Sequence, residues 1–217
     1  MENPSGICSS KKIIMTFFVD YNFFNPKVKL LSDRYDLIKE EYLLNKDNLE
    51  FKDFTKQQDQ NIVEHGKGYP IGVESYFTAP EKTDKKGWHM AGILYENYLY
   101  NRNSDFLPTL TETLKEIQTL TVCGINILDS GMSLNWHNDD DYVPGVPTLR
   151  VLWGLDIPVE EEGKSIIQMK DPLSDEVETK QFENNKFYCF WPSTTHRIEN
   201  TLSSPRTVVA IDLLVNP

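Results

Sequence analysis

The stretch RTVVAIDLLV (residues 206–215) decides the fold class of this chain. After Arg206 most of its residues are aliphatic or β-branched, which is typical of a buried β-strand. Four other runs share this character and are separated by Gly, Pro, Asn and Asp; they are residues 121–128, 148–157, 165–169 and 186–191. Strands of this length at such intervals indicate an antiparallel sandwich or jelly roll, the architecture that also includes the cupins. We therefore predict a mainly β fold of this cupin-like type.

Two helices are predicted on the outside of the sheets. Residues 32–46 begin with Ser32 as a cap, and residues 109–120 begin with Thr109 and Glu112, which can form a capping box. Apolar or aromatic residues recur at helical spacing in both segments, Tyr35, Ile38 and Tyr42 in the first and Leu110, Leu114, Ile117 and Leu120 in the second. We expect an N-terminal helix and a second helix that braces a sheet.

One domain accommodates all of these elements. The chain has 217 residues, of which 39% are hydrophobic, and this suits a single core. Residues 1–12 are polar and are expected to form a flexible tail. Residues 13–217 are predicted to form the single domain, with its β core at about residues 121–215.

Charge and composition limit the partners and the cellular location. The formal net charge of −11 argues against a nucleic-acid partner, because phosphate binding depends on Lys and Arg. An apolar run at residues 13–24 is interrupted by polar residues at 20–22, so it resembles neither a signal peptide nor a membrane span. The three cysteines are far apart and odd in number, so we expect no disulfide. These features favour a cytoplasmic protein that does not bind membranes.

A candidate metal-binding pair lies in NWHNDDD (residues 135–141). On a strand, the side chains of His137 and Asp139 would point to the same face while Asn138 points away. One imidazole and one carboxylate would then converge on a single ion. An Asp-rich surface turn with an incidental His fits the same pattern, so the pair alone is not specific.

His196 and Arg206, which come later in the chain, complete the pattern. His196 follows the Ser/Thr-rich turn PSTT (residues 192–195), and Arg206 stands ten positions later at the start of an apolar strand. A buried Arg needs an anion, which Asp212 or Glu199 could supply within the protein. Alternatively, His137, Asp139 and His196 bind one face of an iron(II) ion. Arg206 then forms two parallel hydrogen bonds to the distal carboxylate of 2-oxoglutarate. The joint pattern favours this second interpretation.

Several longer stretches resemble a known family. They are GWHMAGIL (87–94), FLPTLTETL (106–114), TLRVLWGLDIP (148–158) and THRIENTLSSPRTVVAIDLL (195–214). In order and content they resemble the aspartyl/asparaginyl β-hydroxylase family of Fe(II)/2-oxoglutarate-dependent dioxygenases. The resemblance covers roughly residues 87–214 and is best marked from His196 to Arg206.

The resemblance implies a double-stranded β-helix that binds iron through two histidines and 2-oxoglutarate through an Arg after the second one. Those roles fall on His137, His196 and Arg206. Arg150 aligns with a family Arg near the co-substrate and is predicted as a second co-substrate residue, although the His commonly found two places later is Leu152 here. The membrane-bound animal members lack an acidic ligand near the first His, whereas Asp139 offers this chain the fuller triad.

The implied reaction is hydroxylation of a C–H bond with molecular oxygen, coupled to decarboxylation of 2-oxoglutarate to succinate. The expected substrate is an amino acid, a small peptide or an aspartyl/asparaginyl-type residue. No catalytic residue beyond the metal ligands is predicted, because the protein side chains do no acid–base work in this scheme.

Two other functions fit parts of the same pattern. A cupin-like isomerase or hydrolase could use two His and one Asp to hold zinc or manganese. A non-catalytic jelly-roll binding module would leave the histidines incidental. The remaining histidines, His65 and His89, are expected to be structural or surface residues, and Asp140 and Asp141 are expected in a solvated loop.

Overall fold

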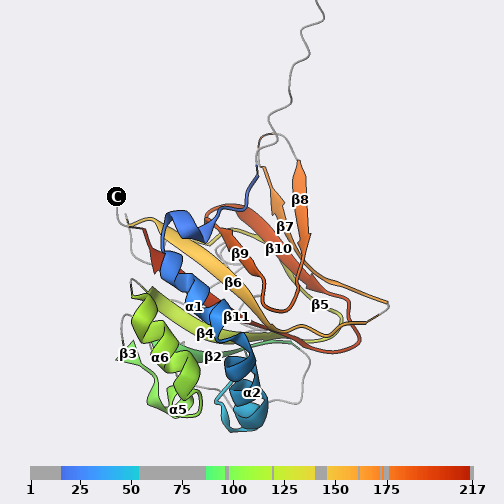
Figure 1. The fold of residues 1–217 in the computed structure, drawn as a ribbon. Helices are drawn as coiled ribbons and strands as arrows, with labels where there is room; N and C mark the ends of the chain where they lie inside the picture. Colours follow the sequence, from blue (N-terminus) through green and yellow to red (C-terminus); the bar gives the residue numbers. More distant parts are fainter. Residues whose placement is uncertain are drawn as a thin grey trace, which may run out of the picture.

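Two antiparallel β-sheets form the centre of the protein (Figure 1). The computed structural model describes residues 16–53, 87–95, 98–118, 120–139, 146–160, 162–171, 173 and 176–215. Within this part of the chain eleven strands are arranged in a seven-stranded and a four-stranded sheet. The mainly β, double-stranded β-helix fold predicted from the sequence is confirmed.

The larger sheet has the order β1-β2-β4-β11-β6-β9, with β3 paired to the end of β2. Its strands are β1 (Lys52–Asp53), β2 (Trp88–Tyr95), β3 (Tyr98–Leu99), β4 (Leu120–Leu128), β6 (Thr148–Asp156), β9 (Phe187–Phe190) and β11 (Arg206–Leu214). The smaller sheet has the order β5-β10-β7-β8. Its strands are β5 (Met132–His137), β7 (Ser165–Lys170), β8 (Val177–Gln181) and β10 (Thr195–Asn200).

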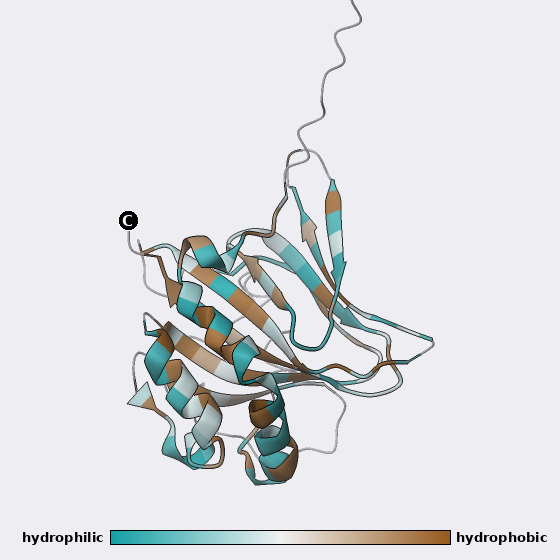
Figure 2. Ribbon diagram, viewed as in Figure 1, coloured by the Kyte–Doolittle hydropathy of each residue, from teal (hydrophilic) through white to brown (hydrophobic). Residues whose placement is uncertain are grey.

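The helices cover one face of the larger sheet (Figure 1). The α-helices are α1 (Lys29–Asp33), α2 (Tyr35–Asn45), α5 (Asn101–Ser104) and α6 (Pro108–Ile117), and the short 3-10 helices are η1 (Tyr21–Phe23), η2 (Pro26–Val28) and η3 (Lys46–Asn48). Figure 2 shows hydrophobic and hydrophilic residues on each of the larger helices, as expected of elements that bury one side.

Each face of the larger sheet has its own hydrophobic core. One core joins the helices to the sheet and includes Ile38 of α2, Leu114 of α6 and Val209 of β11. The other lies between the two sheets and includes Met90 and Val208. The alternation of side chains along β11 therefore sends odd-numbered residues to the helices and even-numbered residues to the space between the sheets.

Five of the eleven strands in the described residues were predicted from the sequence to within one residue at each end, and the others were missed. The five apolar runs correspond to β4, β6, β7, β9 and β11. The edge strand β8 was missed because its sequence VETKQ lacks an apolar face, and pairing with β7 supplies its order. No helix of the described residues is long and apolar enough to cross a membrane. The predicted tail at residues 1–12 lies outside the part of the chain that the structure describes.

The predicted helix starts were wrong in detail. Ser32 lies inside α1 and caps nothing, because the chain kinks at Arg34 (φ −110°, ψ 15°) between α1 and α2. Helix α6 begins at Pro108 and has no capping box. The Glu41 carboxylate on α2 accepts hydrogen bonds from the backbone N–H groups of Thr109 (2.9 Å) and Leu110 (3.3 Å) instead. A side chain from a different helix therefore caps α6.

We expect Glu41→Ala to lower the free energy of unfolding by about 1 kcal/mol, because it leaves two N–H groups of α6 without their acceptor and removes a negative charge from the positive end of the helix dipole. Chemical denaturation monitored by circular dichroism measures the change. The exposed neighbour Glu40 provides the control, since Glu40→Ala should alter the unfolding free energy by only a few tenths of a kcal/mol. Equal effects of the two substitutions would contradict the capping role.

Candidate functional site

Two histidines face each other across neighbouring strands of the smaller sheet. His137 ends β5 and His196 is the second residue of β10, and the antiparallel register places them directly opposite one another. Opposed residues point to the same face, so the two imidazole rings lie with centroids 4.3 Å apart. Both side chains are buried, with 6% and 2% of the residue exposed.

Backbone carbonyl groups orient both rings. The Nδ1 atom of His137 lies 2.5 Å from the carbonyl oxygen of Asn135, and Nδ1 of His196 lies 2.8 Å from that of Thr194. A carbonyl oxygen can only accept, so each Nδ1 carries the proton and donates. The lone pair of each Nε2 is left available, which is the arrangement found for histidines that bind metals.

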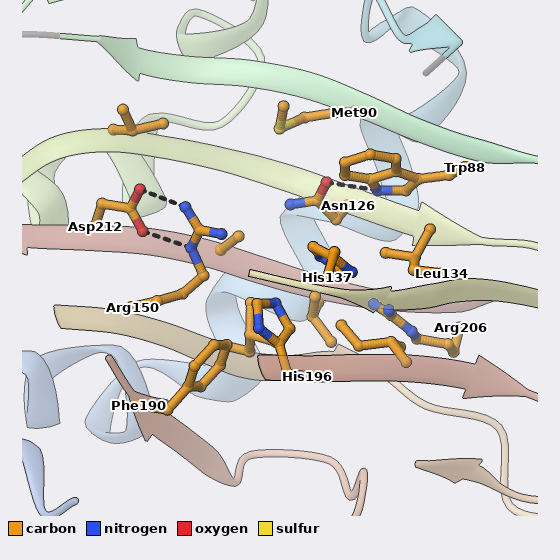
Figure 3. A pocket seen from close by; sticks show the side chains of 15 residues that line it. Trp88, Met90, Asn126, Leu134, His137, Arg150, Phe190, His196, Arg206 and Asp212 are labelled. Atoms are coloured by element: carbon orange, nitrogen blue, oxygen red, sulfur yellow. Dashed lines mark hydrogen bonds and ion pairs between the residues drawn. The ribbon is translucent and has the colours of Figure 1, made fainter. Parts of the chain in front are cut away.

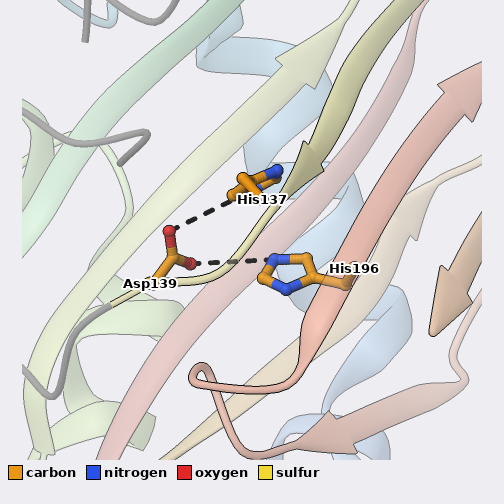
Figure 4. A group of neighbouring side chains, drawn as sticks. All are labelled: His137, Asp139 and His196. Carbon is orange, nitrogen blue, oxygen red and sulfur yellow. Dashed lines mark ion pairs between the residues drawn. The ribbon is translucent and has the colours of Figure 1, made fainter. Parts of the chain in front are cut away.

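Asp139 completes a three-residue cluster (Figure 4). Its backbone N–H donates to the carbonyl of Pro192 at 2.9 Å, which ties the chain after β5 to the turn before β10. Its Oδ1 lies 3.9 Å from Nε2 of His137 and its Oδ2 lies 3.7 Å from Nε2 of His196. Ligand atoms of the three residues all lie within 4.8 Å of one another. The structure thus brings together the three residues that the sequence predicted as metal ligands.

The electrostatic environment keeps His196 neutral. Burial, followed by the neighbouring His137, holds the pKa of His196 well below its usual 6.5. Only a neutral imidazole can donate its lone pair to a metal ion. At neutral pH the ring is therefore in the protonation state that metal binding requires.

Arg206 is buried between the sheets, and no carboxylate of the described residues pairs with it. The residue is 1% exposed, and its Nε and Nη1 atoms have no hydrogen-bond partner among the described residues. Its guanidinium stacks 4.9 Å from the ring centroid of Phe182. Burial lowers the pKa of Arg206 to about 9, which expresses how strongly this site disfavours an isolated positive charge.

The internal ion pair considered for Arg206 is absent within the described residues. Asp212 forms its ion pair with Arg150, and Glu199 hydrogen-bonds Arg197 at 2.6 Å. Both carboxylates are therefore engaged by other arginines. A buried guanidinium in this condition indicates a site for an anion that comes from outside the protein.

A cavity between the sheets connects these groups (Figure 3). The even-numbered residues of β11 line it, as the alternation of side chains along a strand requires: Arg206, Val208, Ala210 and Asp212. His137 and His196 lie between Arg206 at one end and the pair of Arg150 and Asp212 at the other. Two candidate metal ligands, His137 and His196, and the candidate anion-binding residue Arg206 thus line the same cavity.

Arg150 lines the cavity but contacts two protein carboxylates. Its Nε and Nη2 donate to the two carboxylate oxygens of Asp212, each at 2.8 Å, and its Nη1 contacts Oδ2 of Asp139. The assignment of Arg150 as a second co-substrate residue stays a prediction. In the structure the fork of its guanidinium faces Asp212.

Sequence analysis missed Asn126 of β4, which also lines the cavity. The indole N–H of Trp88 donates to Oδ1 of Asn126 at 3.1 Å, and this contact turns the Nδ2 group of the amide away from Trp88 (Figure 3). The signal was present in the sequence, because Asn126 is the polar residue on the inward face of an otherwise apolar strand. The amide offers a second hydrogen-bond donor to a ligand.

The histidines that the sequence did not assign to the site have different surroundings. His89 pairs with Asp129 at 3.2 Å, on the face of β2 opposite the cavity-lining Met90. His65, Asp140 and Asp141 lie outside the described residues.

Comparison with protein families gives one match that covers most of the chain. The model described as aspartyl/asparaginyl beta-hydroxylase matches residues 32–215, which includes all five predicted site residues. A search of the curated proteins finds no match.

The solved structures that match this chain have low sequence identity and low structural similarity to it. An oxidoreductase of the 2OG-Fe(II) oxygenase family from Burkholderia pseudomallei is 12% identical, with a TM-score of 0.44 and coverage of 59% of this chain and 68% of the other. A predicted oxalate decarboxylase from Thermotoga maritima is 14% identical, with a TM-score of 0.37 and coverage of 60% and 84%. The Cnp3 cupin domain of Schizosaccharomyces pombe is 9% identical, with a TM-score of 0.35 and coverage of 58% and 61%.

Proposed function

Since the chain belongs to the aspartyl/asparaginyl β-hydroxylase family, we propose that it is an oxygenase that uses iron(II) and 2-oxoglutarate to hydroxylate a C–H bond. His137, Asp139 and His196 would hold the iron. Arg206 would bind the distal carboxylate of 2-oxoglutarate. Succinate and carbon dioxide are the expected products from the co-substrate.

The donor set fits iron(II). Two imidazole nitrogens and one carboxylate form the facial triad of non-haem iron oxygenases, which leaves other coordination positions open. When bound there, iron supplies the activation of molecular oxygen that C–H hydroxylation requires. Each histidine is already oriented by a backbone carbonyl, so the protein holds the donor atoms ready before the metal arrives.

The observation that carries the proposal is the buried guanidinium of Arg206, which pairs with no carboxylate in the part of the chain that the structure describes. A metal-dependent isomerase or hydrolase of the cupin type needs the three metal ligands but has no evident use for this charge. A dicarboxylic keto acid needs both, because one end chelates the metal and the other end requires a cation. The Nδ2 group of Asn126 is placed to add a neutral hydrogen bond.

The rest of the cavity wall would orient the ligands and exclude water. Apolar side chains from both sheets line it, among them Met90, Leu134, Leu152 and Phe190. In such surroundings the attraction between Arg206 and a carboxylate is stronger than in water. The protein's contribution to the reaction is therefore positioning and a dry site.

The family description suggests the class of substrate. An amino acid, a small peptide or an aspartyl/asparaginyl-type residue suits the family description. We expect the enzyme to act in the cytoplasm, with no nucleic-acid or membrane partner, in keeping with a net charge of −11.

The test is formation of succinate from 2-oxoglutarate in the presence of iron(II), ascorbate and oxygen. Enzymes of this kind turn over slowly without a prime substrate, so the wild-type protein should release succinate above the level of a His196→Ala control. Release should stop when iron or oxygen is withheld. Succinate at the control level under all conditions would count against the proposal.

A further inference from the structure

Arg150 connects the candidate metal site to a second buried carboxylate. It lies on β6 directly opposite Asp212 on β11, and its guanidinium spans from Asp212 to Asp139. All three residues are buried, with 8% of Arg150 and 4% of each aspartate exposed. The three charges therefore form one internal network at the end of the cavity away from Arg206.

The two oxygens of Asp139 have different surroundings within this network. Oδ2 contacts Nη1 of Arg150. Oδ1 is buried and has no hydrogen-bond partner among the described residues, and it lies on the side of His137. When one carboxylate oxygen is hydrogen-bonded and the other has no partner, the free oxygen can bind one more cation.

Hydrogen bonds to Asp212 hold the guanidinium of Arg150 in place independently of its contact with Asp139. Its two hydrogen bonds to Asp212, both 2.8 Å long, use parallel N–H groups and hold the plane of the guanidinium. A planar group fixed on one side presents its remaining N–H groups in a defined direction. Asp212 thus determines where Nη1 meets Asp139.

We propose that Asp212 and Arg150 are positioning residues for the metal ion: Asp212 holds Arg150, and Arg150 holds Oδ2 of Asp139 so that Oδ1 is the atom that binds the metal. This inference rests on the proposed metal site. It assigns Arg150 to the support of a metal ligand and not to a ligand-binding role of its own. Partners of metal ligands of this kind change metal affinity by about 10- to 100-fold.

The sign of the effect of Arg150→Gln separates positioning from simple charge. Electrostatics alone predicts that loss of a positive charge beside Asp139 tightens the binding of a divalent cation. Positioning predicts weaker binding, because Asp139 loses the group that holds it. Calorimetric titration of the full chain with Mn(II), without 2-oxoglutarate, measures the affinity directly.

We expect Arg150→Gln and Asp212→Asn each to weaken Mn(II) binding by about 10-fold or more. Asp129→Asn is the matched control, since Asp129 pairs with His89 outside the cavity and its loss should leave the affinity unchanged. If Arg150→Gln does not fold, Arg150→Lys replaces it, because lysine keeps the charge without the fork and should weaken binding as well. Unchanged or tighter binding in the folded Arg150 variant would overturn the inference.

The same titration distinguishes this inference from the proposed function. If the wild-type protein does not bind Mn(II), or binds it as well after His196→Ala, the metal site itself is wrong. If wild-type binding depends on His196 but not on Arg150 and Asp212, the metal site stands and only the positioning role fails.

Discussion

Arg206→Ala is expected to weaken the binding of 2-oxoglutarate by about 100-fold or more while leaving the binding of Mn(II) almost unchanged. Removal of one partner from a buried charge pair costs about 2–5 kcal/mol. The guanidinium lies at the opposite end of the cavity from Arg150, and the three candidate metal ligands do not contact it through any hydrogen bond or ion pair that the described residues form. Calorimetric titration of the Mn(II)-loaded protein with 2-oxoglutarate measures the effect.

The control for this prediction is Arg197→Ala. Arg197 follows His196 in the sequence but does not line the cavity. Its guanidinium donates a hydrogen bond to Glu199 and lies 5.7 Å from the ring centroid of Trp136. Its loss should leave 2-oxoglutarate affinity within about twofold of the wild type, because exposed and half-exposed pairs contribute little. Retained 2-oxoglutarate affinity in Arg206→Ala would instead favour a cupin-like isomerase or hydrolase.

A second substitution, Arg206→Met, tests how Arg206 affects the free energy of unfolding of the ligand-free protein. Because burial of an unpaired guanidinium opposes folding, Arg206→Met should not lower the free energy of unfolding of the ligand-free protein as a typical core substitution does. Ligand binding would then weaken without the loss of stability that a core substitution causes, which identifies a residue retained for binding.

His196→Ala is expected to abolish stoichiometric metal binding at micromolar protein, a loss of about 100-fold or more in affinity. It removes one of three donor groups, and loss of a mere supporting partner already costs about 10- to 100-fold. Titration with Mn(II), followed by calorimetry, gives the affinity. Succinate formation should fall to the background level in the same variant.

His89→Ala is the control for His196→Ala. His89 is a partly buried histidine that pairs with Asp129 on the other face of β2, so its removal tests for a general effect of losing a histidine. The His89→Ala variant should bind Mn(II) with the affinity of the wild type. Equal losses in both variants would point to a folding defect, and retained binding in His196→Ala would contradict the assignment of the metal ligand.

Local patterns in the sequence were enough for β6 and β11, the strands that carry Arg150 and Arg206. The alternation of side chains along RTVVAIDLLV puts Arg206 and Asp212 on the same face of a strand, and the structure shows that this face lines the cavity. The spacing of His137 and Asp139 predicted that they lie on one side of the chain, and they do. These features depend on the period of two along a strand, which neighbouring residues set by themselves.

The partners of the charged groups depended on the tertiary structure. The sequence offered Asp212 as a partner for Arg206, but the two residues are six positions apart on one strand, too far to touch. Pairing of β11 with β6 instead brings Arg150 to Asp212. The cap of α6 follows the same rule, because its acceptor Glu41 comes from another helix.

The sequence by itself therefore predicted the mainly β fold, the shared face of Arg206 and Asp212, and the five candidate site residues. Only the tertiary structure decided that His137 and His196 are opposed, that Asp139 contacts Arg150, and that Arg206 pairs with no carboxylate among the described residues. The physical reason is the range of the interactions. Side-chain direction is a property of the local backbone, whereas charge pairing and burial depend on which strands lie next to each other.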